Sequence, residues 1–186
     1  MKRFFDLILA LILVIPLLML MFLITIAIIF TSKGPVLYWS KRVGVNNIIF
    51  KMPKFRSMNI DTPEVATHLL SDANNFLTPV GRFLRRSSLD ELPQLFSILK
   101  GDMSFVGPRP ALFNQNDLIK LRSENNIDKL KPGLTGWAQI NGRDELTIPQ
   151  KVSIELEYME KKSFWFDLKI LWMTLLKVLK NQGVSH

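Results

Sequence analysis

The stretch Leu7–Phe30, LILALILVIPLLMLMFLITIAIIF, decides the class of this protein because its 24 consecutive residues carry no charge. A helix of that length would be about 36 Å long, enough to cross a hydrocarbon core of about 30 Å. The stretch is longer than the apolar region of about 7 to 15 residues in a cleavable signal peptide, and no small-x-small cleavage site follows it. We therefore predict a retained membrane segment.

Two features of this segment favour a re-entrant helix over a spanning one. Pro16 lies near the middle, where it removes a backbone hydrogen bond and predicts a break or kink. Basic residues flank both ends, with Lys2 and Arg3 before the segment and Lys33 after it. Because Lys and Arg mark the cytoplasmic side of a membrane, both ends are expected on that side. We predict a helix-break-helix that enters and leaves through one face, and a kinked spanning helix is the alternative.

The composition of the whole chain limits the classes of function. The chain has 186 residues, enough for one domain, residues 33–186, behind a membrane segment at residues 1–32. Its 24 Lys and Arg against 16 Asp and Glu give a formal charge of +8, which favours an anionic partner: phospholipid, a phosphorylated substrate or nucleic acid. The lack of cysteine excludes disulfides and a Cys nucleophile, and any zinc site would rest on His68 and His186 alone.

The region after the membrane segment is predicted to form a β-hairpin. Two β-rich runs, Val36–Val43 and Ile48–Phe55, flank the turn Gly44-Val45-Asn46-Asn47, whose Gly and Asn residues tolerate positive φ. Pro53 restricts the second run to an edge or a strand end. Residues 62–70 predict a short helix.

The segment Ser88–Leu99, SLDELPQLFSIL, has apolar residues at helical spacing and predicts an amphipathic helix. A capping box of Ser88 and Glu91 would start this helix early, whereas Pro93 at the first helical position would start it later. Either start places the carboxylates of Asp90 and Glu91 near the N-terminus of the helix.

The last third of the chain combines loops and helices. Asp102–Ala111 and Lys131–Asp144 are rich in Gly and Pro and are predicted loops, which carry functional sites more often than cores do. Lys151–Tyr158 is predicted to be helical. Ser163–Lys180 has an apolar face flanked by lysines, which indicates a helix lying in the membrane surface or, alternatively, packed on the core. The chain is therefore predicted to be α/β and mostly helical, a monotopic membrane protein with amphipathic interfacial helices.

The adjacent carboxylates Asp90 and Glu91 are the main candidates for chemistry. In isolation, an Asp-Glu pair at a helix start is usually explained by its interaction with the helix dipole. Arg85 precedes this pair and Arg109 follows it, however, and guanidinium groups neutralise phosphate oxygens. A carboxylate can attack phosphorus when such cations are present, and a metal ion held by oxygen ligands would complete the site.

Six basic residues between the membrane segment and residue 56 provide a second candidate surface. They are interpreted either as an ordinary solvated face or, beside a membrane, as a surface that binds lipid headgroups. These residues are Lys33, Lys41, Arg42, Lys51, Lys54 and Arg56.

Four motifs together resemble the bacterial sugar transferase family, the small monotopic phosphoglycosyl transferases that act on undecaprenyl phosphate. They are GPVLYWSKRVG at 34–44, FKMPKFRSM at 50–58, GRFLRRSSLDELPQLFSILKGDMSFVGPRP at 81–110 and PGLTGWAQINGRD at 132–144. The resemblance covers essentially the whole chain. Two departures are Ile15-Pro16, where members often carry Ser-Pro, and Glu155, where Asp is common.

The resemblance implies a two-step exchange at an Asp-Glu dyad. Asp90 would attack the β-phosphorus of a UDP-sugar, release UMP and carry the phosphosugar until undecaprenyl phosphate accepts it. Glu91 would hold Mg²⁺ together with Asp90 or handle the proton of the acceptor. Arg85 and Arg109 would bind phosphates.

The resemblance also implies substrates and a location. Lys54 and Arg56, from the Lys-Phe-Arg motif, would face the lipid phosphate or the dyad. The chain resembles short members that use N-acetylated hexosamines and initiate a surface glycan such as the O-antigen of lipopolysaccharide. The expected location is the cytoplasmic face of the bacterial inner membrane. The sequence names neither the sugar nor the oligomeric state.

Two other classes of function explain less of the sequence. A non-enzymatic module that binds anionic lipid explains the charge and the apolar segment but leaves Asp90 and Glu91 without a role. Nucleic-acid binding is disfavoured because no recognised nucleic-acid motif is present and the basic residues lie beside a membrane segment. We therefore expect no nucleic-acid partner.

Overall fold

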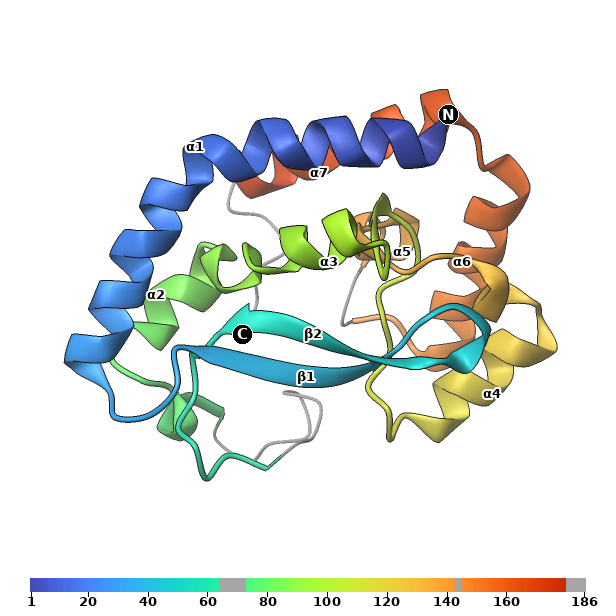
Figure 1. Ribbon diagram of the computed structural model, residues 1–186. Coiled ribbons are helices and arrows are strands. Elements are labelled where there is room, and N and C mark those ends of the chain that lie inside the picture. The colour runs from blue at the N-terminus through green and yellow to red at the C-terminus, as the bar shows by residue number, and fades with distance from the viewer. Residues whose placement is uncertain (64–72, 143–144, 180–186) are drawn as a thin grey trace.

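The computed structural model describes residues 1–63, 73–142 and 145–179 of the chain. Within these ranges the protein is mostly helical and contains two small two-stranded sheets (Figure 1). The predicted mostly helical class with a β-hairpin is thus confirmed. Most of the helix predicted at 62–70 lies outside the described residues.

The elements follow one another along the chain as helices interrupted by short strands. The helices are α1 (Lys2–Thr31), α2 (Gly81–Arg86), α3 (Gln94–Lys100), α4 (Asn116–Glu124), α5 (Trp137–Ile140), α6 (Ile148–Lys161) and α7 (Phe164–Leu179). The strands are β1 (Leu37–Val43), β2 (Ile49–Phe55), β3 (Ser104–Val106) and β4 (Gly133–Thr135). Short 3-10 turns include η4 (Leu89–Glu91) and η5 (Ile127–Lys129).

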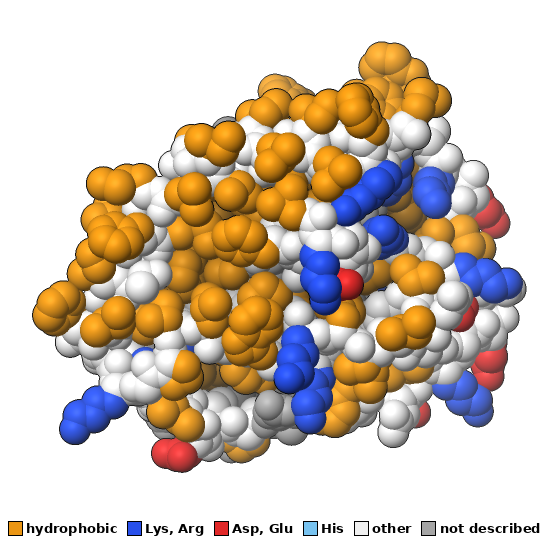
Figure 2. Space-filling view, in the orientation of Figure 1, with side chains coloured by type: hydrophobic (Ala, Val, Ile, Leu, Met, Phe, Trp, Pro, Cys, Tyr) orange, Lys and Arg blue, Asp and Glu red, His pale blue; other side chains and the backbone are white. Residues whose placement is uncertain are grey.

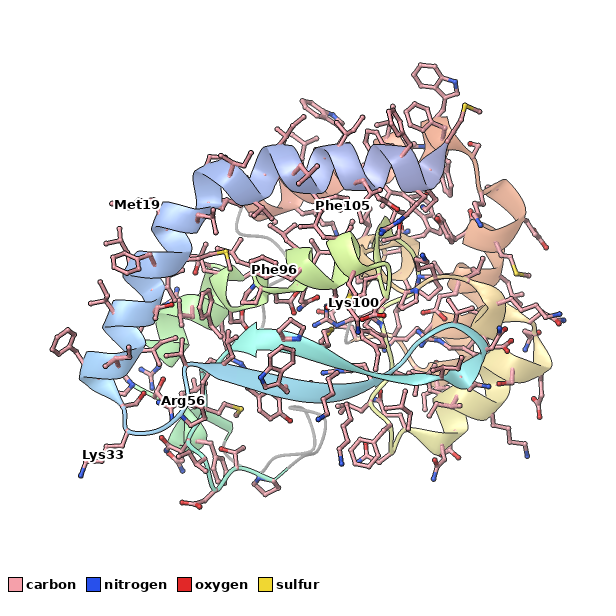
Figure 3. The ribbon with its side chains drawn as sticks, in the orientation of Figure 1. Met19, Lys33, Arg56, Phe96, Lys100 and Phe105 are labelled. Atoms are coloured by element: carbon pink, nitrogen blue, oxygen red, sulfur yellow. The ribbon has the colours of Figure 1, made fainter. Side chains whose placement is uncertain are left out.

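Helix α1 continues through Pro16, so the predicted break between two helices is wrong. The helix bends instead, and its corner lies near Met19 (Figures 1 and 3). Proline has no N–H and its ring crowds the preceding turn, so a helix that continues through proline is expected to bend. By length and composition, α1 is sufficient to cross a membrane.

One face of α1 packs on the rest of the protein on both sides of the bend. Before it, Ala10 is fully buried in a cluster with Ile98 of α3. After it, Ile28 is buried in a second cluster with Leu84 of α2. The opposite face of α1 is apolar and exposed, and Figure 2 shows its side chains as a broad apolar surface. The helix therefore lies along the domain for its whole length.

The predicted hairpin is confirmed, with β1 and β2 antiparallel and Leu37 opposite Phe55. Asn46 and Asn47 in the connecting turn have φ values of 52° and 59°. Asn adopts the left-handed region more readily than most residues, so these two side chains suit the turn. Pro53 lies in a two-stranded sheet, where it does not interrupt a central strand.

The two segments predicted as loops contain a second sheet, which corrects that prediction. Strand β3 pairs in parallel with β4, with Ser104 opposite Gly133. The backbones approach so closely that a Cβ atom on Gly107 would lie 2.2 Å from the carbonyl oxygen of Lys131. Three-residue strands that depend on glycine show too little alternation to be recognised from sequence.

Helix α3 begins after Pro93, so the later of the two predicted starts is correct. Ser88 adopts a left-handed φ of 56° and caps nothing with its side chain, so the capping box is absent. A capping box does occur at the start of α6, between Thr147 and Gln150. This Thr-x-x-Gln signal is readable in the sequence and was not among the predictions.

Helix α7 has two different faces, and each matches one of the two interpretations. Asp167 and Ile170 are buried against the core. Trp165 and Trp172 are 78% and 61% exposed and continue the apolar surface beside α1. The helix is thus docked on the domain while its apolar side stays uncovered.

Candidate active site

The dyad Asp90 and Glu91 lies in η4, between α2 and α3. The neighbouring Leu89 and Leu92 pack against a cluster that contains Phe55 at the end of β2. This apolar contact holds η4 beside the hairpin and brings the dyad to Lys54, the residue before Phe55. Asp90 itself is buried, with 6% of its surface exposed.

Glu91 binds two cations through one oxygen. Its Oε1 lies 2.8 Å from Nζ of Lys54 and 2.8 Å from a terminal guanidinium nitrogen of Arg109. Lys54 comes from β2 and Arg109 from the Pro108-Arg109-Pro110 loop after β3, so the contacts join three distant segments. Glu91 is therefore the centre around which the site is assembled.

The loop that carries Arg109 is fixed by backbone and side-chain contacts. The Gly133 N–H donates to the carbonyl oxygen of Pro108 at 2.9 Å. On the other side, the guanidinium of Arg42 donates to the carbonyl oxygen of Pro110 at 3.0 Å. Arg109 thus projects from a loop that is held between the second sheet and the hairpin.

The two carboxyl groups have opposite pKa shifts. Burial raises the pKa of Asp90, and although Lys54, Arg85 and Arg109 lower it and Glu91 raises it further, the net shift is upward. Burial also opposes ionisation of Glu91, but the charges of Arg109 and Lys54 hold its pKa well below the usual range. Glu91 consequently stays ionised at neutral pH, while Asp90 is the more basic carboxylate.

Burial lowers the pKa of the Lys54 ammonium against the opposing effect of both dyad carboxylates. A buried ammonium group is stable in its charged form only when carboxylates such as these two lie beside it. Lys54 is therefore part of the charge cluster, as the motif implied.

Arg42 belongs to the same cluster, although the sequence analysis placed it only in a general basic surface. Burial and the nearby Arg109 lower its pKa to about 10, against the attraction of Glu91. The hairpin register contains the signal that was missed. Tyr38 pairs with Lys54, and Arg42 lies four residues after Tyr38, so alternation puts Arg42 and Lys54 on one face of the sheet.

Arg56 contacts the end of α1 and not the dyad carboxylates, while its expected position near the lipid phosphate stays a prediction. Its side chain donates to the carbonyl oxygen of Ser32 at 2.9 Å and to that of Lys33, at the end of α1. Figure 3 shows Arg56 beside Lys33 at this end of the helix. Arg56 thus connects the C-terminal end of α1 to the hairpin through hydrogen bonds.

The charges around the dyad are unbalanced. Two carboxylates are surrounded by four basic side chains, those of Lys54, Arg42, Arg85 and Arg109. Among the described residues, no group of three or more His, Cys, Asp or Glu is arranged to hold a metal ion. Such a cluster of basic side chains around an acidic pair is typical of a protein that handles phosphate groups.

The chain belongs to the bacterial sugar transferase family, whose sequence model matches residues 1–181. It is 41% identical over 98% of its length to an undecaprenyl-phosphate glucose phosphotransferase of Komagataeibacter xylinus. It is 38% identical over 98% of its length to the UDP-glucose:undecaprenyl-phosphate glucose-1-phosphate transferase of Escherichia coli K12. It is also 38% identical over 81% of its length to an undecaprenyl-phosphate galactose phosphotransferase of Salmonella typhimurium. The resemblance found in the motifs is therefore confirmed.

The matches cover different shares of these relatives. The chain spans 36% of the Komagataeibacter protein, 41% of the E. coli protein and 34% of the Salmonella protein. It spans 80% of an uncharacterized sugar transferase of Bacillus subtilis, EpsL, to which it is 42% identical. All four matches cover at least four fifths of this chain.

Proposed function

We propose that this protein transfers a phosphosugar from a UDP-sugar to undecaprenyl phosphate. The observation that carries the proposal is the buried Asp90 beside a cationic cluster that is centred on Glu91. The names of the relatives, which give glucose and galactose as the sugars, support this class of reaction. A module that only binds lipid would not need such a site.

In the first step, an oxygen of the Asp90 carboxylate attacks the β-phosphorus of the UDP-sugar. The bond between the β-phosphorus and the bridging oxygen breaks, UMP leaves with that oxygen, and the phosphosugar stays on Asp90. Arg85, Arg109 and Lys54 offset the repulsion between the carboxylate and the diphosphate. Burial makes Asp90 a more basic, and so a better, nucleophile when ionised.

In the second step, a phosphate oxygen of undecaprenyl phosphate attacks the same phosphorus and releases Asp90. The low pKa of Glu91 makes it a poor base at neutral pH, so its proposed role is to position Lys54 and Arg109 and to contribute to a metal site. The lipid-linked diphosphosugar is the product, and Asp90 is regenerated.

The dyad also fits Mg²⁺, which commonly binds one or two carboxylates together with substrate phosphates. Asp90 and Glu91 would supply the carboxylates, and the metal would neutralise charge on the diphosphate. Like charges 4 Å apart repel by about 4 kcal/mol at an effective dielectric of about 20, which gives the metal a function here.

A panel of UDP-sugars tests the reaction and the sugar together. UDP-glucose, UDP-galactose and their N-acetylated counterparts are each incubated with the protein, Mg²⁺ and undecaprenyl phosphate, and UMP is measured. We expect UMP release with at least one donor, and the resemblance to short members of the family favours a UDP-linked N-acetylated hexosamine. After exhaustive chelation of Mg²⁺ we expect no UMP release. If none of these donors gives UMP, the proposed reaction is wrong. The preferred sugar would also indicate whether an O-antigen-type glycan is the product.

We also propose that α1 is re-entrant, with both ends at the cytoplasmic face of the bacterial inner membrane. Both halves of α1 pack on the same domain, and both ends are fastened to it, by Lys2 to Asp167 and by Arg56 to Ser32. A spanning helix would have to give up one of these sets of contacts. The exposed apolar faces of α1 and α7 would then contact the acyl region, with bilayer lipid as a partner.

Single cysteines near residue 2, with Lys2 itself kept, and near residue 33 test this topology, because the chain has no other cysteine. An impermeant thiol reagent applied to intact cells should label neither position, and both should react after lysis. Labelling of the cysteine near residue 2 in intact cells would show that α1 spans the membrane.

A further inference from the structure

A cavity of about 180 Å³ lies at the start of α1, apart from the dyad. It is bounded by α1, by the segment before β4 and by the end of α6. Four basic residues line it, Lys2, Arg3, Lys131 and Lys162, together with one carboxylate, that of Asp6. None of the side chains assigned to the dyad site lines this cavity.

The α1 side of the cavity is fixed by interactions with the core. The Lys2 ammonium binds the carboxylate of Asp167, and Arg3 donates to the carbonyl oxygen of Leu99 at 2.8 Å. Asp6 is buried and accepts a hydrogen bond from the Phe105 N–H. These contacts neutralise Lys2 and hold this wall in one position.

The other two basic residues differ from Lys2 and Arg3. Over the ranges that the structure describes, neither Lys131 nor Lys162 takes part in an ion pair or a side-chain hydrogen bond. The cavity is several times the roughly 30 Å³ that a water molecule occupies in the liquid, so it can accept a group of the size of phosphate. Two ammonium groups around such a space attract an anion.

The surroundings of the cavity suit a lipid. Lys162 is the second residue before α7, whose first residue, Phe164, packs edge-on against Phe5 of α1 with ring centroids 5.3 Å apart. Trp165 beside it is 78% exposed. Aromatic residues favour the headgroup level of a bilayer, so the membrane orientation proposed above places this cavity at that level.

We propose that the cavity binds the phosphate of an anionic phospholipid headgroup through Lys131 and Lys162. Leu130 and Val106 in the lining and the exposed aromatic side chains nearby provide apolar contacts for the rest of the lipid. This inference rests on the proposed membrane orientation but not on the chemistry of the dyad. Free inorganic phosphate could contact the same two lysines, but it has no acyl chains to contact the apolar residues.

Native mass spectrometry of the full chain in detergent tests the site, with phosphatidylglycerol as the probe. The double variant Lys131→Gln/Lys162→Gln should bind this lipid about 30-fold more weakly than the wild type, because each lysine near an anionic headgroup contributes roughly a factor of five. The matched control Lys120→Gln/Lys129→Gln removes the same charge from exposed positions and should bind like the wild type.

The outcomes distinguish binding of a lipid from binding of a free anion, and they test the lipid site independently of the proposed reaction. Equal binding by both double variants would overturn the site, and displacement of the lipid by equimolar inorganic phosphate would assign the cavity to a free anion instead. Phosphatidylcholine has no net charge, so it should bind weakly and with the same affinity to the wild type and to Lys131→Gln/Lys162→Gln. UMP release in detergent should be the same in both double variants, and its absence in the wild type would refute the proposed reaction without affecting the lipid result.

Discussion

The ion pairs of Glu91 and Glu155 show two uses of a buried glutamate in one small protein. Glu155 on α6 binds a single partner, Arg122 of α4, through both of its oxygens, and both residues are buried. Glu91 instead shares one oxygen between Lys54 and Arg109, within a cluster that has more cations than carboxylates. The first pair is complete without a ligand. The second has an excess of positive charge that an anionic substrate can neutralise.

The difference lies in charge balance as well as in burial. A buried charge without a partner is unfavourable, and the Glu155 carboxylate and the Arg122 guanidinium balance each other one to one. An excess of one sign persists where function requires it, as at a site for phosphate. The comparison predicts that mutations in the Glu155 pair act on stability and that mutations around Glu91 act on the reaction.

The largest expected effect is on stability and comes from Arg122→Leu. This change leaves Glu155 buried without its partner, which costs about 3–5 kcal/mol and lowers Tm by about 6–20 °C for a chain of this size. Thermal unfolding of the detergent-solubilised protein measures it. The double variant Arg122→Leu/Glu155→Leu should recover most of the loss, and a Tm as low as that of the single variant would show that the pair itself is essential.

The next effect is on the reaction and comes from Arg109→Lys. An ammonium is a point charge, so it does not hold Glu91 and a phosphate at once as a planar guanidinium does. We expect UMP release to fall about 100-fold, or about 2.7 kcal/mol in the activation barrier, with Tm unchanged. Arg82→Lys, on the exposed side of α2, is the matched control and should keep full activity. Near-normal release by Arg109→Lys would contradict the proposed phosphate contact.

The sequence predicted the elements whose signals are local. Local sequence determines three of these elements. The apolar run determines α1, the β-rich runs on either side of Asn46 and Asn47 determine the hairpin, and Pro93 determines where α3 begins. The Asp90–Glu91 dyad and Arg109 could be named because the motifs around them resemble a known family. The geometry around these residues depends on contacts between segments that are far apart in the chain.

The errors arose where tertiary contacts decide the outcome. Pro16 bends α1 without breaking it, because the domain packs against both halves of the helix. Arg56 follows Lys54 by two residues, and only the folded structure shows that it binds the end of α1. Arg42 could have been found from strand register, whereas the parallel pairing of β3 with β4 joins two short segments that carry no strand signal.

The most direct test of covalent catalysis by Asp90 is intact-protein mass spectrometry of the wild type and of Asp90→Asn. Each is mixed with Mg²⁺ and the UDP-sugar that gives the most UMP, without undecaprenyl phosphate. We expect the wild type to release at most about one UMP per chain and to gain the mass of one phosphosugar on the peptide that contains Asp90. Asp90→Asn should remain folded and gain nothing. An adduct that persists in Asp90→Asn, or UMP release that requires the lipid acceptor and leaves no adduct on the wild type, would contradict the covalent role of Asp90.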